Sequence, residues 1–151
     1  MIIVSIRFAT IDDIASIKNL ESTSNLSTWS AEQYAATLAD PAYILIVLED
    51  QDDTVAFLLA RVSPDENNTG TIEVMNIAVH TRMRKKGVGR RLMEQVVIKS
   101  LYKSGTVQLE VRARNADAIR FYERIGFDTV GRRKDYYTNP TDDAVLMNRI
   151  F

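Results

Sequence analysis

A cluster of cationic residues and glycines at residues 82–91 is the part of the sequence best suited to bind phosphate. The segment reads RMRKKGVGRR, with six cationic side chains and two glycines ahead of an apolar helical pattern. Gly87 and Gly89 allow a ligand to approach the backbone closely, and the helix that follows offers free N–H groups and its positive dipole end. We therefore expect a bound pyrophosphate here, with a solvated basic loop or a nucleic-acid patch as the alternatives.

The spacing within this segment excludes two common phosphate motifs. A Walker loop requires G-x-x-x-x-G-K-[ST], which the chain lacks. A dinucleotide fingerprint requires a third glycine where Leu92 stands. The pattern that remains is Arg84-x-x-Gly87-x-Gly89.

Glu110 and Tyr122 are the side chains best placed to move protons. Glu110 projects from the polar face of a predicted strand, where partial burial would make it a better general base. A surface salt bridge with Arg112 or Arg114 is the alternative. Tyr122 lies on the same helical stripe as Ile119, so its position alone indicates core packing with its hydroxyl held by one partner.

Composition narrows the function classes. The chain has 151 residues, of which 46% are hydrophobic, so we expect one domain over residues 1–151. A net charge of −1 and a pI near 5.9 argue against nonspecific nucleic-acid binding. The absence of cysteine excludes disulfides, thiolate metal sites and a cysteine acyl-enzyme, and the single histidine gives little support to a Ser-His-Asp mechanism. We expect no metal.

The location of the protein is predicted from its apolar segments. The first residues lack a basic region and soon become acidic. The longest apolar run, residues 42–48, is too short to span a bilayer. We therefore expect a cytoplasmic protein without a membrane partner.

Alternation and helical periodicity predict the elements that must hold these side chains. We expect seven strands, over residues 2–8, 43–48, 55–62, 71–79, 107–111, 127–136 and 144–150. Four helices are expected. The first is capped by Thr10, and the second begins at the capping box at Ser30. The third follows Gly87 and Gly89 and is stopped by Gly105, and the fourth lies between Asn115 and Gly126. A loop around residues 25–28 separates the first two.

The fourth strand changes face midway. Ile72 and Val74 share one parity, whereas Met75, Ile77 and Val79 share the other. This predicts a β-bulge, a feature that often lies beside an active site, although a strand buried on both faces would give the same pattern. The order βααβββαβαββ predicts an α/β domain, equally described as α+β, with a mixed and mostly antiparallel sheet.

That element order, with a glycine loop after the fourth strand, resembles the GNAT superfamily of acyl-CoA-dependent N-acyltransferases. Three motifs make the resemblance specific: NIAV at residues 76–79, the string LEVRARNADAI at residues 109–119 followed by Phe121-Tyr122, and Tyr136-Tyr137 followed by Asp143-Ala144. Together they resemble the RimI type, the ribosomal-protein alanine N-terminal acetyltransferases. His80 and Thr81 depart from the Asp-Pro that is common in this type.

The resemblance implies acetyl-CoA as co-substrate, Glu110 as proton acceptor and Tyr122 as proton donor to the coenzyme thiolate. It implies coenzyme contacts at Ile77, Ala78, Val79, Arg84, Lys85, Lys86, Gly87, Val88, Gly89, Arg90 and Asn115. Backbone groups of the bulged strand would bind the pantetheine amides and polarise the thioester carbonyl.

The resemblance also implies a gate over the acceptor, formed by Tyr136, Tyr137 and the loop near Trp29. We call these residues the acceptor gate. The activity that the resemblance implies is acetylation of the N-terminal amine, alanine in this type, of a small-subunit ribosomal protein. A GNAT acting on lysine side chains or on a small amine is the enzyme alternative, and a non-catalytic acyl-CoA-binding module is the other.

Overall fold

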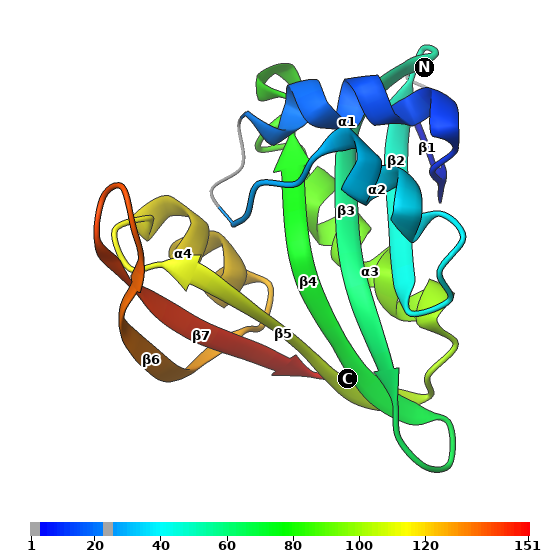
Figure 1. Cartoon of the computed structure of the whole chain (residues 1–151). Helices are drawn as coiled ribbons and strands as arrows, with labels where there is room; N and C mark the ends of the chain where they lie inside the picture. The colour runs from blue at the N-terminus through cyan, green and yellow to red at the C-terminus, as the bar shows by residue number, and fades with distance from the viewer. Residues whose placement is uncertain (1–3, 23–25) are drawn as a thin grey trace.

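The computed structural model describes residues 4–22 and 26–151, so the predictions made for Ile2, Ile3 and Asn25 lie outside the described residues. The predicted order of helices and strands is confirmed (Figure 1). The strands are β1 (Val4–Phe8), β2 (Tyr43–Asp50), β3 (Asp53–Pro64), β4 (Thr69–Val79), β5 (Ser104–Arg112), β6 (Asp128–Tyr137) and β7 (Asp142–Ile150). The helices are α1 (Ile14–Glu21), α2 (Ala31–Thr37), α3 (Val88–Ser100) and α4 (Ala116–Arg124), with short 3-10 turns η1 (Ile11–Asp13) and η2 (Thr81–Met83).

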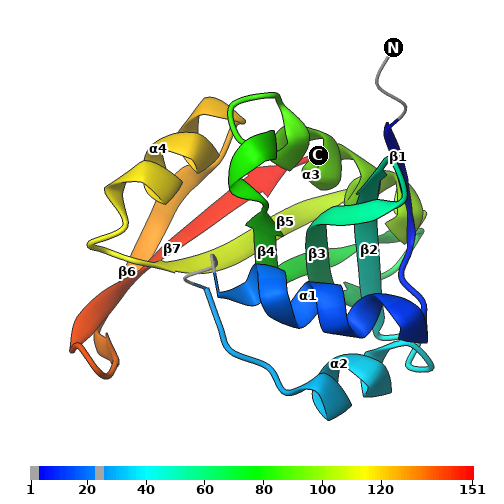
Figure 2. The same cartoon turned by 90° about the horizontal axis from the view of Figure 1, so that it is seen from above.

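The seven strands form one mixed sheet in the order β1-β2-β3-β4-β5-β7-β6. Only β4 and β5 run parallel, and every other neighbouring pair is antiparallel. Viewed from above, α1 and α2 lie on one side of the sheet, and α3 and α4 lie on the other (Figure 2). The predicted α/β fold class is therefore confirmed.

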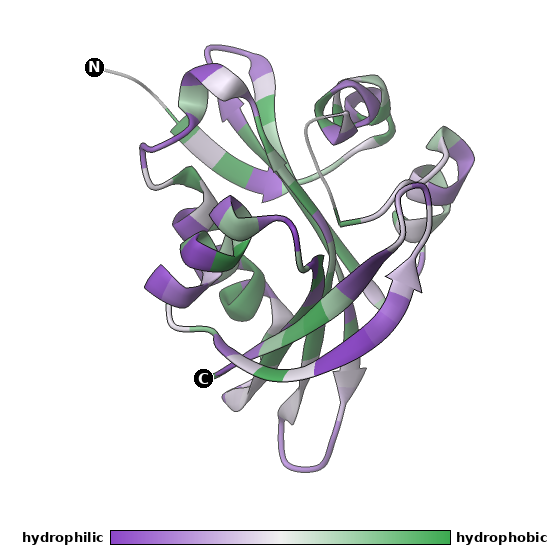
Figure 3. Cartoon of the chain, turned by 90° about the vertical axis from the view of Figure 1, so that its left-hand side faces the viewer, coloured by the Kyte–Doolittle hydropathy of each residue, from purple (hydrophilic) through white to green (hydrophobic). Residues whose placement is uncertain are grey.

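Two hydrophobic clusters hold these layers together. Ile46 and Leu58 join Leu92 of α3 in the larger cluster, whereas Val47 and Phe57 join the α1–α2 side. Neighbouring residues of one strand thus enter opposite clusters, as the pleat requires. Each such fully buried side chain contributes about 1.5–3 kcal/mol relative to an exposed one. By contrast, β6 is mostly exposed and hydrophilic (Figure 3).

The predicted bulge in β4 is present. Leu59 of β3 pairs with Asn76, and the next residue, Ala60, pairs with Val74, so Met75 is the extra residue. Val74 and Ile77 consequently face the same cluster although three positions separate them. The change of parity in the sequence therefore has its physical cause in one inserted residue.

Gly105 does not stop the third helix, so that prediction was wrong. The helix α3 ends at Ser100, and Leu101 takes the left-handed conformation with a φ of 63°. Gly105 lies instead in β5, paired with Gly70 of β4. A Cβ on Gly105 would lie 1.9 Å from the Gly70 carbonyl oxygen, so glycine is required for the close approach of the parallel strands.

Candidate active site

The strands β4 and β5 separate from one another near the middle of the sheet. Their parallel pairing runs from Thr69 with Ser104 to Glu73 with Gln108 and goes no further. Beyond that point β4 pairs only with β3, and β5 pairs only with β7. The two strands diverge there in Figure 1. The backbone edges that face each other across this opening are therefore available to a ligand, and Ile77, Ala78 and Val79 lie on the β4 side.

Internal hydrogen bonds already engage part of this β4 edge. The Ile77 N–H donates to the Oδ1 of Asn76 at 3.1 Å. The Nε of Arg84 donates to the Val79 carbonyl at 3.2 Å. A ligand that used these two backbone groups would exchange existing hydrogen bonds for its own.

The predicted phosphate segment lies directly after β4, across η2 and the start of α3. Gly87 is the N-cap of α3 with a φ of 77°, and no side chain caps the helix. A Cβ on Gly87 would meet nothing within 4 Å, so the space above this N-terminus is open. Val88 is buried, so only its backbone faces a ligand there. The free N–H groups of a 13-residue helix thus point into an open, cationic environment.

Five of the six cations of residues 82–91 make no ion pair with any described residue. Arg82 is the exception, because its Nη1 lies 2.9 Å from Oδ2 of the buried Asp50 and so ties the segment to β2. Lys85 adopts a left-handed φ of 60°, which helps to turn the chain. Arg84, Lys86 and Arg90 remain available to neutralise phosphate charge.

Gly89 has a packing role that the sequence analysis did not predict. A Cβ there would lie 2.6 Å from the Cζ of Phe121, so the glycine permits α3 to pack closely on α4. Asn115 caps α4 by accepting a hydrogen bond from the Ala118 N–H at 3.2 Å. The open helix terminus, the free cations and the parted strands together form a surface suited to an anionic ligand with an extended arm.

Glu110 lies on β5 beside this opening and lines a hollow on the face of the sheet. The hollow has a volume of about 160 Å³ and is lined by Glu73, Gln108, Leu109, Glu110, Val130, Arg133, Leu146, Met147 and Asn148. The Glu110 side chain is 28% exposed, and its Oε1 lies 3.5 Å from the Nε of Arg133. The carboxylate is thus half-buried and accessible from the hollow, as a general base must be.

The two tyrosines of the acceptor gate lie close to Glu110. The charge of Glu110, followed by burial and a side-chain hydrogen bond to Glu110, raises the pKa of Tyr136. Burial, followed by the charge of Glu110, raises the pKa of Tyr137 to about 12. The two rings meet edge to face with centroids 5.0 Å apart, and the Arg112 guanidinium lies 4.4 Å from the centre of the Tyr137 ring.

Tyr122 of α4 belongs to the larger hydrophobic cluster. It is 3% exposed, and burial, followed by the influence of Tyr137, raises its pKa. Its ring packs on Phe121 and Phe127. Burial therefore keeps the hydroxyl protonated at neutral pH.

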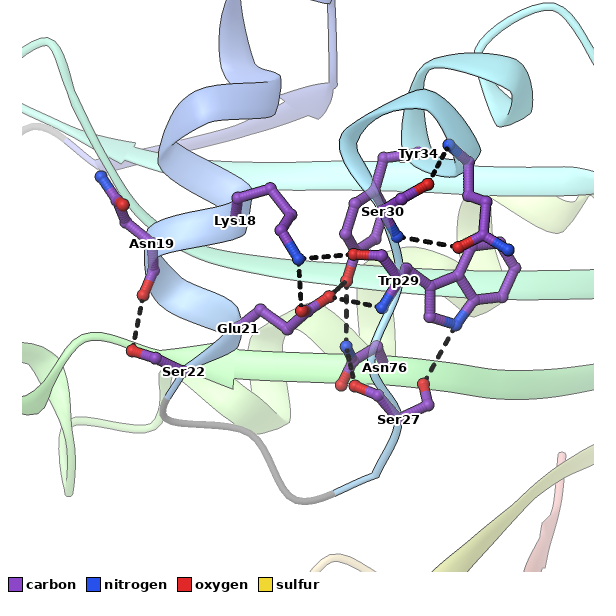
Figure 4. A network of polar contacts seen from close by, with 10 residues as sticks. Lys18, Asn19, Glu21, Ser22, Ser27, Trp29, Ser30, Tyr34 and Asn76 are labelled. Carbon is purple, nitrogen blue, oxygen red and sulfur yellow. Dashed lines mark hydrogen bonds and ion pairs between the residues drawn. The ribbon is translucent and has the colours of Figure 1, made fainter.

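Trp29 is not brought together with Glu110. Its indole stacks on Tyr34 at 5.8 Å, and its Nε1 donates to the Ser27 hydroxyl at 3.1 Å (Figure 4). Its backbone N–H donates to Glu21. Trp29 thus anchors the α1–α2 loop, whereas Tyr136 and Tyr137 lie close to Glu110.

A buried polar network that the sequence did not predict fastens this loop to the bulge. The Tyr34 hydroxyl donates to Glu21 at 2.5 Å and accepts from Asn76 at 3.0 Å. The Ser27 hydroxyl donates to the carbonyl of Met75, the inserted residue, at 2.6 Å. Figure 4 shows these side chains converging from α1, the loop, α2 and β4. The loop and the bulged edge therefore form one unit.

Arg133 is the other residue of the site that the sequence analysis missed. It lies three positions before Tyr136, and regular alternation would place the two side chains on opposite faces.

No group of histidine, cysteine or carboxylate residues able to hold a metal ion occurs among the described residues. None of the helices in the described part of the chain is long and apolar enough to cross a membrane.

Comparison with known proteins agrees with this geometry. The family model described as acetyltransferase (GNAT) family matches residues 14–127. The chain is 33% identical over 139 residues to the [ribosomal protein bS18]-alanine N-acetyltransferase of Escherichia coli, covering 89% of each protein. It is 38% identical over 91 residues to the N-alpha-acetyltransferase RimI of Mycobacterium tuberculosis, covering 60% of this chain and 53% of that protein.

Solved structures give the same assignment. The crystal structure of the ribosomal-protein-S18-alanine N-acetyltransferase from Escherichia coli superposes with a TM-score of 0.77 at 27% identity, over 98% of this chain and 94% of that one. The fold is shared with Arabidopsis thaliana Naa50 in complex with the bisubstrate analogue CoA-Ac-MVNAL, with a TM-score of 0.81 at 22% identity, over 98% and 99% of the two chains. The chain belongs to the acetyltransferase (GNAT) family.

Proposed function

We propose that this protein is an acetyl-CoA-dependent Nα-acetyltransferase that modifies the N-terminal amine of a protein, preferring alanine, with a small-subunit ribosomal protein as its acceptor. The observation that carries the proposal is the half-buried Glu110 carboxylate, which lines a hollow beside the point where β4 and β5 part and has Arg133 at 3.5 Å and the gate tyrosines close by. The 33% identity to the bacterial alanine N-acetyltransferase supports the class of acceptor. We place the activity in the cytoplasm, where ribosomal proteins are made.

The residues of the site fit acetyl-CoA in three places. The open N-terminus of α3 and the cations Arg84, Lys85, Lys86 and Arg90 accept the phosphates, with backbone contacts from Gly87, Val88 and Gly89. The parted edge of β4 at residues 77–79 accepts the pantetheine arm, and Asn115 lies at the start of α4. When bound, acetyl-CoA supplies the acetyl group as a thioester.

In the proposed mechanism, Glu110 and Tyr122 handle the two protons of direct transfer. Glu110 accepts the proton that the acceptor amine loses as its nitrogen bonds to the acetyl carbon. Tyr122 donates its hydroxyl proton to the sulfur as the carbon–sulfur bond breaks. The Tyr122 hydroxyl suits this step because burial keeps it protonated.

An α-amine is a better acceptor for this arrangement than a lysine side chain. With pKa values near 8 and 10.4, about 10% of an α-amine but only about 0.04% of a lysine amine is neutral at pH 7. The difference is roughly 200-fold in reactive species before any contact with the protein. One half-buried carboxylate therefore has much less deprotonation to perform on a chain terminus.

The test is a competition between a short Ala-starting peptide and its Nα-blocked, lysine-containing twin, followed by mass spectrometry. We expect the free terminus to be acetylated faster by at least the roughly 200-fold difference in neutral amine. Peptides with other first residues in place of Ala measure the preference at that position. Faster modification of the blocked peptide contradicts the proposal and identifies a lysine acetyltransferase instead.

A further inference from the structure

Asp142 and Asp143, at the start of β7, contact both the β5–α4 turn and strand β6. Asp142 accepts a hydrogen bond from the Arg114 N–H at 3.0 Å and one from the Asp143 N–H at 2.8 Å. The Asp143 carbonyl accepts from the Ala113 N–H at 3.0 Å. Ala113 and Arg114 form the turn between β5, which carries Glu110, and α4, which carries Tyr122. This side of the pair therefore fixes the turn that joins the two proposed proton carriers.

The Asp143 side chain also holds a large bulge in the neighbouring strand β6. Arg133 pairs with Ala144 and Tyr137 pairs with Asp142, so residues 134–136 stand opposite Asp143 alone. Asp143 Oδ1 accepts the Asp135 N–H at 2.8 Å, at a residue whose φ is 51°. Its Oδ2 accepts from Nε of Arg132 at 2.6 Å. The carboxylate thus replaces the strand partner that the bulged backbone has lost.

The bulge decides which side chains reach Glu110. Arg133 and Tyr136 are three residues apart and would face opposite sides of a regular strand. With the bulge, the Arg133 Nε lies 3.5 Å from Glu110, and Tyr136 lies close enough for the charge of Glu110 to be the largest influence on its pKa. The Arg133 guanidinium also lies 5.6 Å from the centre of the Tyr136 ring.

We propose that Asp143, supported by Asp142, is a positioning residue that holds the β6 bulge so that Tyr136 and Arg133 lie against the Glu110 carboxylate. This inference rests on the proposed function, because it gives a role to a residue that acts through the proposed base. Asp143 touches neither acceptor nor coenzyme in this scheme. It sets the orientation of the base and of one wall of the acceptor gate.

The first test is kinetic and compares three variants with the wild-type enzyme on an Ala-starting peptide. Asp143→Ala removes the acceptor for the Asp135 N–H, and we expect kcat/KM for the peptide to fall by about 10–100-fold, the scale of a displacement of about 1 Å. The KM for acetyl-CoA stays within about twofold, because the phosphate segment is untouched. Asp143→Asn keeps an oxygen for the amide and restores most of the activity. Arg132→Gln removes only the ion pair and stays close to wild type.

The second test does not depend on the acceptor. In a ¹³C-tyrosine NMR titration, assigned with Tyr136→Phe, we expect the pKa of Tyr136 to lie above its ordinary value in the wild type, because the charge of Glu110 has the largest influence on it. Glu73 of β4 acts in the same direction, and Arg133 of β6 acts in the opposite one. In Asp143→Ala we expect the pKa of Tyr136 to fall towards about 10, and in Asp143→Asn to stay raised.

The two tests separate the two proposals. If no peptide is acetylated but the Tyr136 titration moves as expected, the proposed function fails and the positioning role stands. A titration that is the same in Asp143→Ala and wild type overturns the positioning role whatever the peptides show. Loss of activity in Arg132→Gln equal to that in Asp143→Ala also overturns it, since the ion pair would then be responsible. Asp128→Ala, at an exposed β6 aspartate, is the matched control.

Discussion

Replacing Tyr34 by Phe tests whether the buried network stabilises the α1–α2 loop. The change removes a hydroxyl that donates to Glu21 at 2.5 Å and accepts from Asn76 at 3.0 Å, on a side chain with 0% exposure. A hydrogen bond to a charged group contributes about 1.5–3 kcal/mol and one between neutral groups about 0.5–1.5 kcal/mol. Because Glu21 keeps its contacts with Lys18 and the Trp29 N–H, we expect a loss of about 2–3 kcal/mol.

That loss corresponds to a measurable change in melting temperature. For a chain of this size, 1 kcal/mol shifts the Tm by about 2–4 °C, so Tyr34→Phe lowers it by about 4–12 °C in calorimetry. Tyr43→Phe is the matched control, because its ring also packs on Trp29 but its hydroxyl has no hydrogen bond to the described residues. If both variants melt within about 2 °C of the wild type, the network contributes nothing to stability and the reasoning fails.

The pH dependence of the Tm difference between the wild type and Tyr34→Phe gives an internal check. Burial alone raises the pKa of Glu21, but hydrogen bonds from Lys18, Tyr34 and the Trp29 backbone outweigh it, so the pKa is lowered from 4.5. A lowered pKa stabilises the fold above about 4.5, and this contribution is lost as the pH falls through the folded value. The Tm gap between wild type and Tyr34→Phe is therefore largest near pH 7 and narrows below pH 4 or so. A gap that widened in acid would contradict the role of the Glu21 charge.

Two further substitutions examine the chemistry itself. Gly89→Trp places a bulky ring at the start of α3, against Phe121, and we expect calorimetry to detect no acetyl-CoA binding, whereas unchanged affinity would reject the phosphate assignment. Glu110→Gln removes the proton acceptor with little change in side-chain size, and the chemical step should slow by about 10²–10⁴-fold while acetyl-CoA affinity persists. Wild-type turnover in this variant at neutral pH would make Glu110 structural.

Local patterns in the sequence predicted the elements and one irregularity. The change of parity between Val74 and Ile77 indicated the bulge, because one inserted residue reverses every later side chain. The motif around Ser30 predicted the start of α2, and its side chain does accept from the Gln33 N–H. These features depend on neighbours within a few positions, so a single sequence contains the required information.

The network and the β6 bulge depend instead on distant partners. Glu21 would ordinarily be read as a solvated helix residue, yet it is 7% exposed and meets Tyr34, 13 positions later. Asn76 reaches Tyr34 across 42 positions. Arg133 lies in a run of exposed charges, and only the register with β7 turns it towards Glu110. Hydrophobic periodicity cannot predict such contacts, because tertiary packing creates them.

The same distant contacts explain how the β4 edge can be both stable and receptive. A bulged, parted strand exposes backbone groups that would otherwise lack partners, and the protein supplies them: Asn76 Oδ1 for the Ile77 N–H and Arg84 for the Val79 carbonyl. Exchange of these bonds for bonds to pantetheine contributes little net free energy, because similar hydrogen bonds are broken and formed. In the proposed complex, the phosphate end then provides most of the affinity, and Arg84 would link the two ends, since its transfer to the pyrophosphate would free the Val79 carbonyl for the pantetheine arm.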